Sequence, residues 1–154
     1  MRHLPSRGFK ALVALALLAG SVVGTQAVAA DGSTNGLGQS WPNAQDVSSS
    51  ARWHVYVFTR NGVRYVQVND LHGNVRGAIA TAGGSFMVLP IGVDANRVAT
   101  PDDPQPAPAS TDGDIVYKDD AVQVLAAPQA DGTVMMRAAL STCKDPVECS
   151  SRVD

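Results

Sequence analysis

WHVYVFTRNGVRYVQVN, residues 53–69, is the stretch that decides the fold. Two runs of β-branched and aromatic residues flank Asn61-Gly62, a dipeptide that suits the two left-handed positions of a type I′ turn. A two-residue turn fixes the register of the hairpin around it. The expected pairs are Phe58 with Tyr65, Val57 with Val66, Tyr56 with Gln67, Val55 with Val68, and His54 with Asn69.

Alternation of side chains along a strand gives this hairpin two different faces. One face gathers the four valines, and the other gathers the aromatic residues Tyr56, Phe58 and Tyr65. Such aromatics either pack in a core or form a binding surface.

Two further hairpins extend the first one. Residues 70–74 (DLHGN) predict a type I turn with a bulge that leads into a strand over 75–82, with Ala78 beside Val66 and Ile79 beside Tyr65. Gly83-Gly84 then turns the chain into 85–91, where Pro90 indicates an edge strand or its end. These segments predict a four-stranded meander, with Phe86 on the same side as the aromatic face.

The second half of the chain repeats the hairpin pattern after a proline-rich connector over 99–111. Strands are expected over 114–118, 121–126 and 133–140, joined by a two-residue turn at Asp119-Asp120 and by a turn at Asp131-Gly132. The first of these turns pairs Tyr117 with Val122. The whole pattern predicts an all-β fold, a single small antiparallel domain of about seven strands, arranged as a sandwich or a barrel.

The N-terminal 30 residues carry the pattern of a cleaved signal peptide. Three basic residues precede an apolar run from Ala11, which ends in the small residues 27–30 (AVAA). The run is too short to cross a bilayer as a helix, and the signal lacks both a lipoprotein cysteine and a twin-arginine pair. We therefore expect Sec-type export to the periplasm or the exterior, with no transmembrane segment and no lipid anchor.

The expected mature chain divides into three parts. Residues 31–51 are poor in apolar residues and predict a flexible N-terminal arm, in which Trp41 either docks on the domain or anchors a partner. Residues 52–142 form the β-domain. Residues 143–154 form a tail that we expect a Cys143–Cys149 disulfide to pin, since an even pair of cysteines in an exported chain normally oxidises.

Charge excludes one class of partner. The 12 Lys and Arg residues fall to nine once residues 1–30 are removed, whereas all 14 Asp and Glu residues remain, so the mature net charge is −5. A chain this acidic is a poor ligand for nucleic acid.

Catalytic motifs are sparse. The chain has no G-x-S-x-G and no glycine-rich phosphate loop, and we expect no cofactor. The one arrangement of residues that could bind a metal or catalyse a reaction is a cluster of His54, Asp70 and His72 at one end of the first sheet. This cluster predicts, as the alternative to a non-enzymatic module, a metal-binding protein or a hydrolase.

The favoured interpretation is a non-enzymatic module. We expect an exported, soluble β-domain that binds a protein or an envelope component in the cell envelope. Its candidate binding residues are Tyr56, Phe58, Tyr65 and Phe86, or the edge strand that continues from Phe86 to Ile91.

Overall fold

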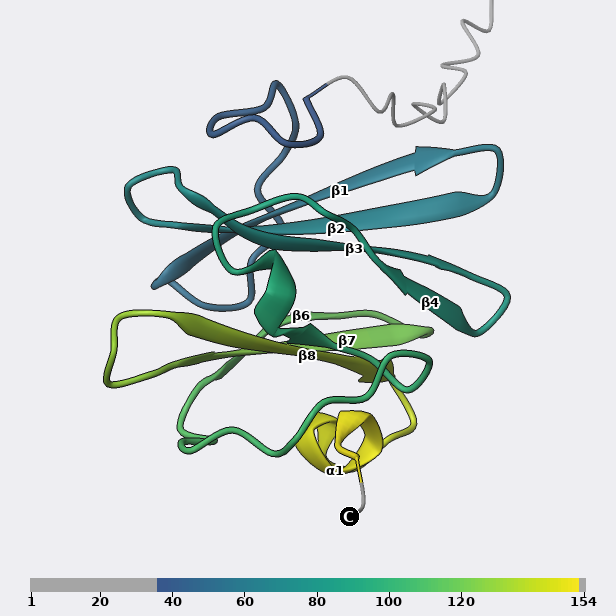
Figure 1. Cartoon of the computed structure of the whole chain (residues 1–154). Helices are drawn as coiled ribbons and strands as arrows, with labels where there is room; N and C mark the ends of the chain where they lie inside the picture. Colours follow the sequence, from purple (N-terminus) through teal and green to yellow (C-terminus); the bar gives the residue numbers. More distant parts are fainter. Residues whose placement is uncertain (1–35, 153–154) are drawn as a thin grey trace, which may run out of the picture.

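The computed structural model describes residues 36–152, which form two four-stranded sheets packed face to face (Figure 1). The first sheet has the order β1-β2-β3-β4 and the second the order β5-β8-β7-β6. The all-β prediction is confirmed, and the two sheets make the domain a sandwich. The strands are β1 (Trp53–Arg60), β2 (Val63–Asp70), β3 (Val75–Ala82), β4 (Ser85–Val88), β5 (Val98–Ala99), β6 (Asp114–Lys118), β7 (Val122–Pro128) and β8 (Val134–Leu140).

The β1–β2 hairpin contains all five predicted pairs, in a register that runs from Arg60 opposite Val63 to Trp53 opposite Asp70. Asn61 and Gly62 both adopt positive φ, 51° and 78°, as a type I′ turn requires. The hairpin continues into β3 and β4 as the expected antiparallel meander.

The predicted pairing of β2 with β3 is wrong by one residue over most of its length. Val66 pairs with Ile79 and Tyr65 with Ala80, because the register shifts between Val68 and Asn69, where Arg76 is the extra residue on β3. A one-residue bulge moves every later side chain to the other face of the sheet. Phe86 consequently lies in the core between the sheets and not beside the aromatic face.

The bulge also determines where Arg76 makes its contacts. Its guanidinium lies 2.5 Å from the carboxylate of Asp94, which is almost fully buried, and donates a hydrogen bond to the carbonyl of Gly132. Asp94 also accepts a hydrogen bond from the backbone N–H of Val134 in the second sheet. This network ties the first sheet to the turn between β7 and β8.

The second sheet contains a strand that was not predicted. β5 has only two residues and pairs in parallel with β8, so the count is eight strands and the fold is mainly, not wholly, antiparallel. It follows the short 3-10 helix η1 (Ala95–Arg97) and begins the crossing from one sheet to the other. A two-residue strand carries too little pattern to be recognised from sequence.

The predicted register of β6 with β7 is also wrong. Tyr117 pairs with Val124 and not with Val122. The turn is longer than two residues because the carboxylate of Asp119 accepts hydrogen bonds from the N–H groups of Ala121 and Val122. A register shift between Ile115 and Tyr117 then lets both Val116 and Tyr117 pack against the core.

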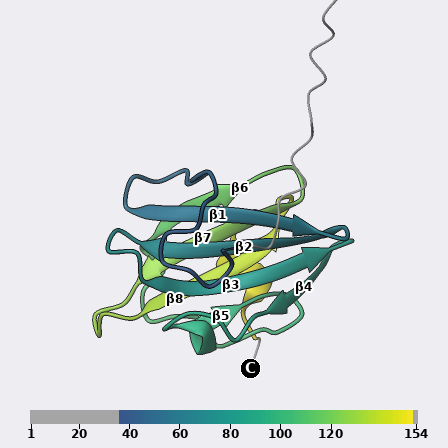
Figure 2. The ribbon, with the colours of Figure 1, turned by 90° about the horizontal axis from the view of Figure 1, so that it is seen from above.

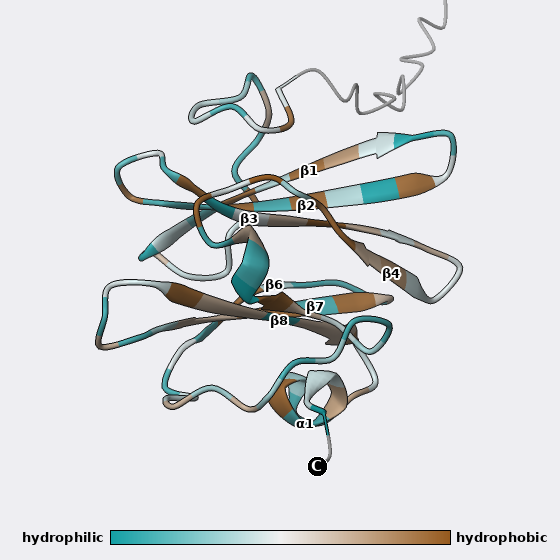
Figure 3. Ribbon diagram, viewed as in Figure 1, coloured by the Kyte–Doolittle hydropathy of each residue, from teal (hydrophilic) through white to brown (hydrophobic). Residues whose placement is uncertain are grey.

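Both sheets contribute to one hydrophobic core. In Figure 3 much of the apolar colouring lies on the strands, and several of the turns are hydrophilic. The members of the core are mostly small, branched side chains. They are Trp53, Val55, Val66, Val68, Ile79, Phe86, Val98, Val116, Val122, Val124, Ala126, Val134, Met136 and Ala138.

The expected arm is not free of the domain over its described part, residues 36–51. These residues lie across the outer face of the first sheet (Figure 2), and the N–H of Ser49 donates to the carbonyl of Val116 in β6. Arg52 adds an ion pair with Asp114 of β6. The predicted signal peptide, residues 1–30, lies outside the described residues. Within residues 36–152, no helix is long and apolar enough to span a membrane.

The C-terminal tail contains the expected Cys143–Cys149 disulfide and one helix that was not predicted, α1 (Pro146–Ser150). Asp145 caps the helix by accepting a hydrogen bond from the N–H of Val147, and Pro146 occupies its first turn. An Asp-Pro pair at this position is a helix-start signal that the sequence does contain.

Candidate binding surface

Trp41 is the largest exposed apolar side chain of the described residues, at 58% exposure. Its ring meets the His54 ring edge-on, with centroids 5.3 Å apart. On another side the indole lies against Gly73, where a Cβ atom would come within 2.6 Å of it. These contacts with His54 and Gly73 form what we call the seat of Trp41, and most of the surface of Trp41 is nevertheless exposed to solvent.

His54 and its neighbours hold that seat in place. The Nδ1 atom of His54 lies 2.6 Å from the carboxylate of Asp46, and its ring stacks on Tyr56 with centroids 6.4 Å apart. Asp46 also accepts hydrogen bonds from the N–H groups of Ser48 and Val55. Burial alone raises the pKa of Asp46, but these hydrogen bonds outweigh it and hold the pKa below its usual value.

Two buried amide side chains on the outer face of the first sheet anchor the arm that carries Trp41. Gln67 accepts a hydrogen bond from the N–H of Gly38 and donates one to the carbonyl of Gln39, at 2.6 and 2.8 Å. Asn69 donates to the carbonyl of Ser40 at 2.7 Å. Both amides are fully buried, so leaving either unpaired is costly.

This role of Gln67 and Asn69 was not predicted. Their signal is present as two polar residues that alternate with valines in β2 and so occupy one face of the strand. That pattern looks the same whether the amides face water or a covering segment. The expectation of a flexible arm counted apolar content alone, whereas in the described part of the arm amide hydrogen bonds hold residues 38–40.

The predicted aromatic binding face does not form one exposed surface. Tyr56 and Phe58 are buried, at 5% and 2% exposure, and Tyr65 is half-buried. Phe86 lies on the opposite side of the sheet, in the core, because of the bulge in β3. The prediction that these four residues share one side is therefore wrong.

The edge strand named as a second candidate is blocked. β4 is at the edge of its sheet, as expected, but the N–H of Phe86 donates to the carboxylate of Asp102 at 2.6 Å. A capped N–H and the nearby Pro90 leave little for an added strand to pair with.

The structure does not bring His54, Asp70 and His72 together as a metal site. Within the described part of the chain, no group of three or more His, Cys, Asp or Glu residues is placed to hold a metal ion. Nδ1 of His54 is engaged by Asp46, whereas Asp70 accepts hydrogen bonds from the N–H groups of His72 and Asn74. Asp70 thus shapes the turn between β2 and β3, and His72 is exposed on it.

We call Trp41, His54 and the loop of residues 70–74 the Trp41 surface. Leu71, also in that loop, is 53% exposed, so the surface has a second apolar side chain. The loop is held by Asp70, whose pKa burial alone raises but hydrogen bonds from Asn74 and His72 bring below its usual value. An exposed indole that also rests on the domain is suited to contact recognition rather than to proton transfer.

Comparison with family models, with curated proteins and with solved structures finds no match. Within the described residues, the chain is a β-sandwich domain on which the indole of Trp41 is exposed.

Proposed function

We propose that this chain is an exported, soluble, non-enzymatic binding module of the cell envelope. It would be delivered by a Sec-type signal peptide to the periplasm or the exterior and bind a protein or another envelope component through the Trp41 surface. The signal-peptide pattern of residues 1–30 supports the location.

The seat of Trp41 is the observation that carries the proposal. Tryptophan is enriched among the residues that contribute most of the binding free energy of an interface. An exposed indole contributes to that free energy when a partner covers it. The contacts with His54 and Gly73 hold the ring before any partner arrives. Binding then loses little side-chain entropy, which is the main advantage of a preorganised contact residue.

Hydrogen bonds already made at the sheet edges favour binding at the Trp41 surface over the addition of a strand at an edge. Residues 46 and 47 pair with β1, where the N–H of Val47 donates to the carbonyl of Val55. Ser49 pairs with β6, and Asp102 caps β4. Strand addition at these points would need to displace existing hydrogen bonds, whereas contact at Trp41 would not.

A pull-down from envelope extract tests the proposal. The full chain is expressed with its own N-terminal segment, recovered after export, immobilised, and compared with two variants. Trp41→Ala removes the exposed indole. Leu140→Ala removes another exposed apolar side chain, 42% exposed, which lines a hollow with Gly62 at the opposite end of β2.

Wild type and Leu140→Ala should retain the same defined partner, and Trp41→Ala should lose it, with all three showing the same circular dichroism spectrum. Retention of that partner by Trp41→Ala, or its loss by both variants, would refute the role of the Trp41 surface.

A further inference from the structure

Arg137 is a fully buried cation on β8, on the side of the strand that faces away from the core between the sheets. Its guanidinium donates hydrogen bonds to three backbone carbonyls. These belong to Ser150 at 3.1 Å, Gln105 at 3.3 Å and Pro106 at 2.5 Å. Ser150 lies in α1, and the other two lie in the connector, so Arg137 joins the tail to the crossing between the sheets.

The shell around this charge is incomplete. The ion pairs among residues 36–152 include no carboxylate for Arg137, and its Nε atom is buried with no hydrogen-bond partner. Burial lowers the pKa of Arg137. A buried cation held by carbonyl dipoles alone gains hydration when its cover lifts, so the closed arrangement needs support from elsewhere.

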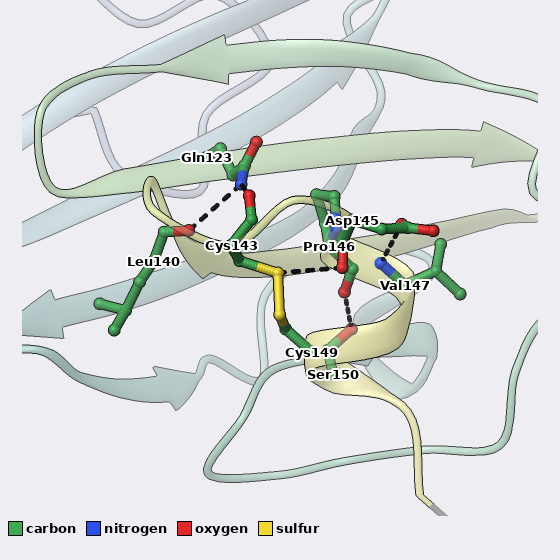
Figure 4. Close-up of a disulfide and its surroundings, with 8 residues drawn as sticks. All are labelled: Gln123, Leu140, Cys143, Asp145, Pro146, Val147, Cys149 and Ser150. Atoms are coloured by element: carbon green, nitrogen blue, oxygen red, sulfur yellow. Dashed lines mark hydrogen bonds between the residues drawn. A yellow bond between two sulfur atoms is a disulfide. The ribbon is translucent and has the colours of Figure 1, made fainter.

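The cover includes a helix too short to form without contacts to the rest of the chain. α1 has five residues, well below the length at which a helix is stable on its own. It is held by the Asp145 cap, by the burial of Pro146, Val147 and Ser150, and by the disulfide drawn in Figure 4, in which Cys149 is exposed. Beyond the helix, the N–H of Gln105 donates to Ser150 and the N–H of Arg152 donates to Gln105.

We propose that the Cys143–Cys149 disulfide is a redox-sensitive latch that keeps α1 closed over Arg137. Reduction releases α1 and the adjoining part of the connector, residues 104–106, and uncovers the guanidinium, while the sandwich stays folded. This device is independent of the function proposed for the Trp41 surface.

The chemistry requires a dithiol donor. A thiolate of the donor attacks Sγ of the exposed Cys149, the S–S bond breaks, and Cys143 leaves as a thiolate that takes up a proton. The second thiol of the donor then displaces Cys149 from the mixed disulfide. Two electrons pass from the donor, which ends as a disulfide, and the protein ends with two thiols.

Amide exchange of the full exported chain, resolved by residue with NMR before and after dithiothreitol, tests the latch. The loop closed by this disulfide is short and contributes about 2 kcal/mol, which corresponds to roughly a 30-fold change in the opening equilibrium. We expect exchange at Gln105 and Arg152 to accelerate by about that factor, and exchange at Val66 and Ile79 in the first sheet to stay the same. The double variant Cys143→Ser/Cys149→Ser should resemble the reduced protein and ignore dithiothreitol.

Arginine accessibility gives a second readout. Phenylglyoxal modifies guanidinium groups that solvent can reach, and Arg52, whose side chain is 62% exposed, serves as the internal control. Modification of Arg137 should become faster on reduction while that of Arg52 is unchanged. Protected Gln105 and Arg137 in the reduced protein would overturn the proposal, and so would a loss of protection at Val66, because the disulfide would then hold the whole domain.

Discussion

Replacing Gly73 with Ala tests the seat of Trp41 directly, because the chain provides a matched control. Gly73 has φ of +82°, and a Cβ there would lie 2.6 Å from the indole. Gly132 has φ of +81°, and nothing lies within 4 Å of a Cβ built there. Both substitutions force an alanine into the left-handed region at a cost of about 1–2 kcal/mol, but only Gly73→Ala must also displace the ring.

The size of the additional effect follows from the exposure of Trp41. The ring is 58% exposed, so roughly two-fifths of a side chain that can bury up to about 250 Å² rests on the domain. That area, roughly 100 Å², corresponds to about 2.5 kcal/mol of burial at about 25 cal/mol per Å². We expect Gly73→Ala to lower the free energy of unfolding by about 2 kcal/mol more than Gly132→Ala does, since part of the contact survives displacement.

Urea denaturation of a double-mutant cycle measures this difference. In a Trp41→Ala background the indole is gone, so Gly73→Ala should cost no more than Gly132→Ala. Equal costs for the two glycine substitutions in the wild-type background would refute the reasoning. So would a cycle in which the effects of Trp41→Ala and Gly73→Ala simply add.

Three further predictions concern the Arg76–Asp94 ion pair between the sheets, the arm held by Gln67, and the loss of stability at acid pH. Arg76→Met leaves the buried carboxylate of Asp94 without its cation and should lower the free energy of unfolding, measured with urea, by about 3 kcal/mol. Arg52→Met, at an exposed ion pair, should lower it by under about 1 kcal/mol. Similar costs for the two variants would contradict the role of burial. Gln67→Leu removes two hydrogen bonds to the arm, so acrylamide quenching of tryptophan fluorescence should increase with the sheet intact, and unchanged quenching would show that the amide does not hold the arm. Hydrogen bonds from Arg52 and then from the Ser50 hydroxyl lower the pKa of Asp114 from 3.8 to about 2, so its contribution to stability is present above pH 3.8 and disappears as the pH falls toward 2; Asp114→Asn should flatten that part of the pH profile, and an unchanged profile would exclude it as a source.

The strands and most of their turns could be predicted because their causes are local. Asn61-Gly62 sets the register of β1 and β2 through backbone conformation alone, and the register holds at every pair. At Asp119 the same reasoning fails, because the carboxylate binds two following N–H groups and lengthens the turn. Short polar side chains compete with the backbone in ways that spacing does not reveal.

The candidate site was only partly foreseeable. Trp41 was singled out, with docking and partner binding as alternatives, and the structure shows an indole that rests on the domain and is still mostly exposed. The predicted binding residues Tyr56, Phe58 and Phe86 are buried, since the arm crosses the sheet and the bulge at Arg76 turns Phe86 inward. Nothing in the spacing of His54, Asp70 and His72 revealed that Asp46 would engage His54.

The sequence by itself determined that the chain is all-β, where its hairpins turn, and that Cys143 and Cys149 can pair, because these features depend on alternation, turn conformation and short separations along the chain. Only the tertiary structure decided the bulge at Arg76, the parallel strand β5, and the anchoring of the arm by Gln67 and Asn69. Each of these depends on a contact between segments far apart in sequence, made by a backbone strand, a guanidinium or a side-chain amide with a partner that its own neighbours in the chain do not identify.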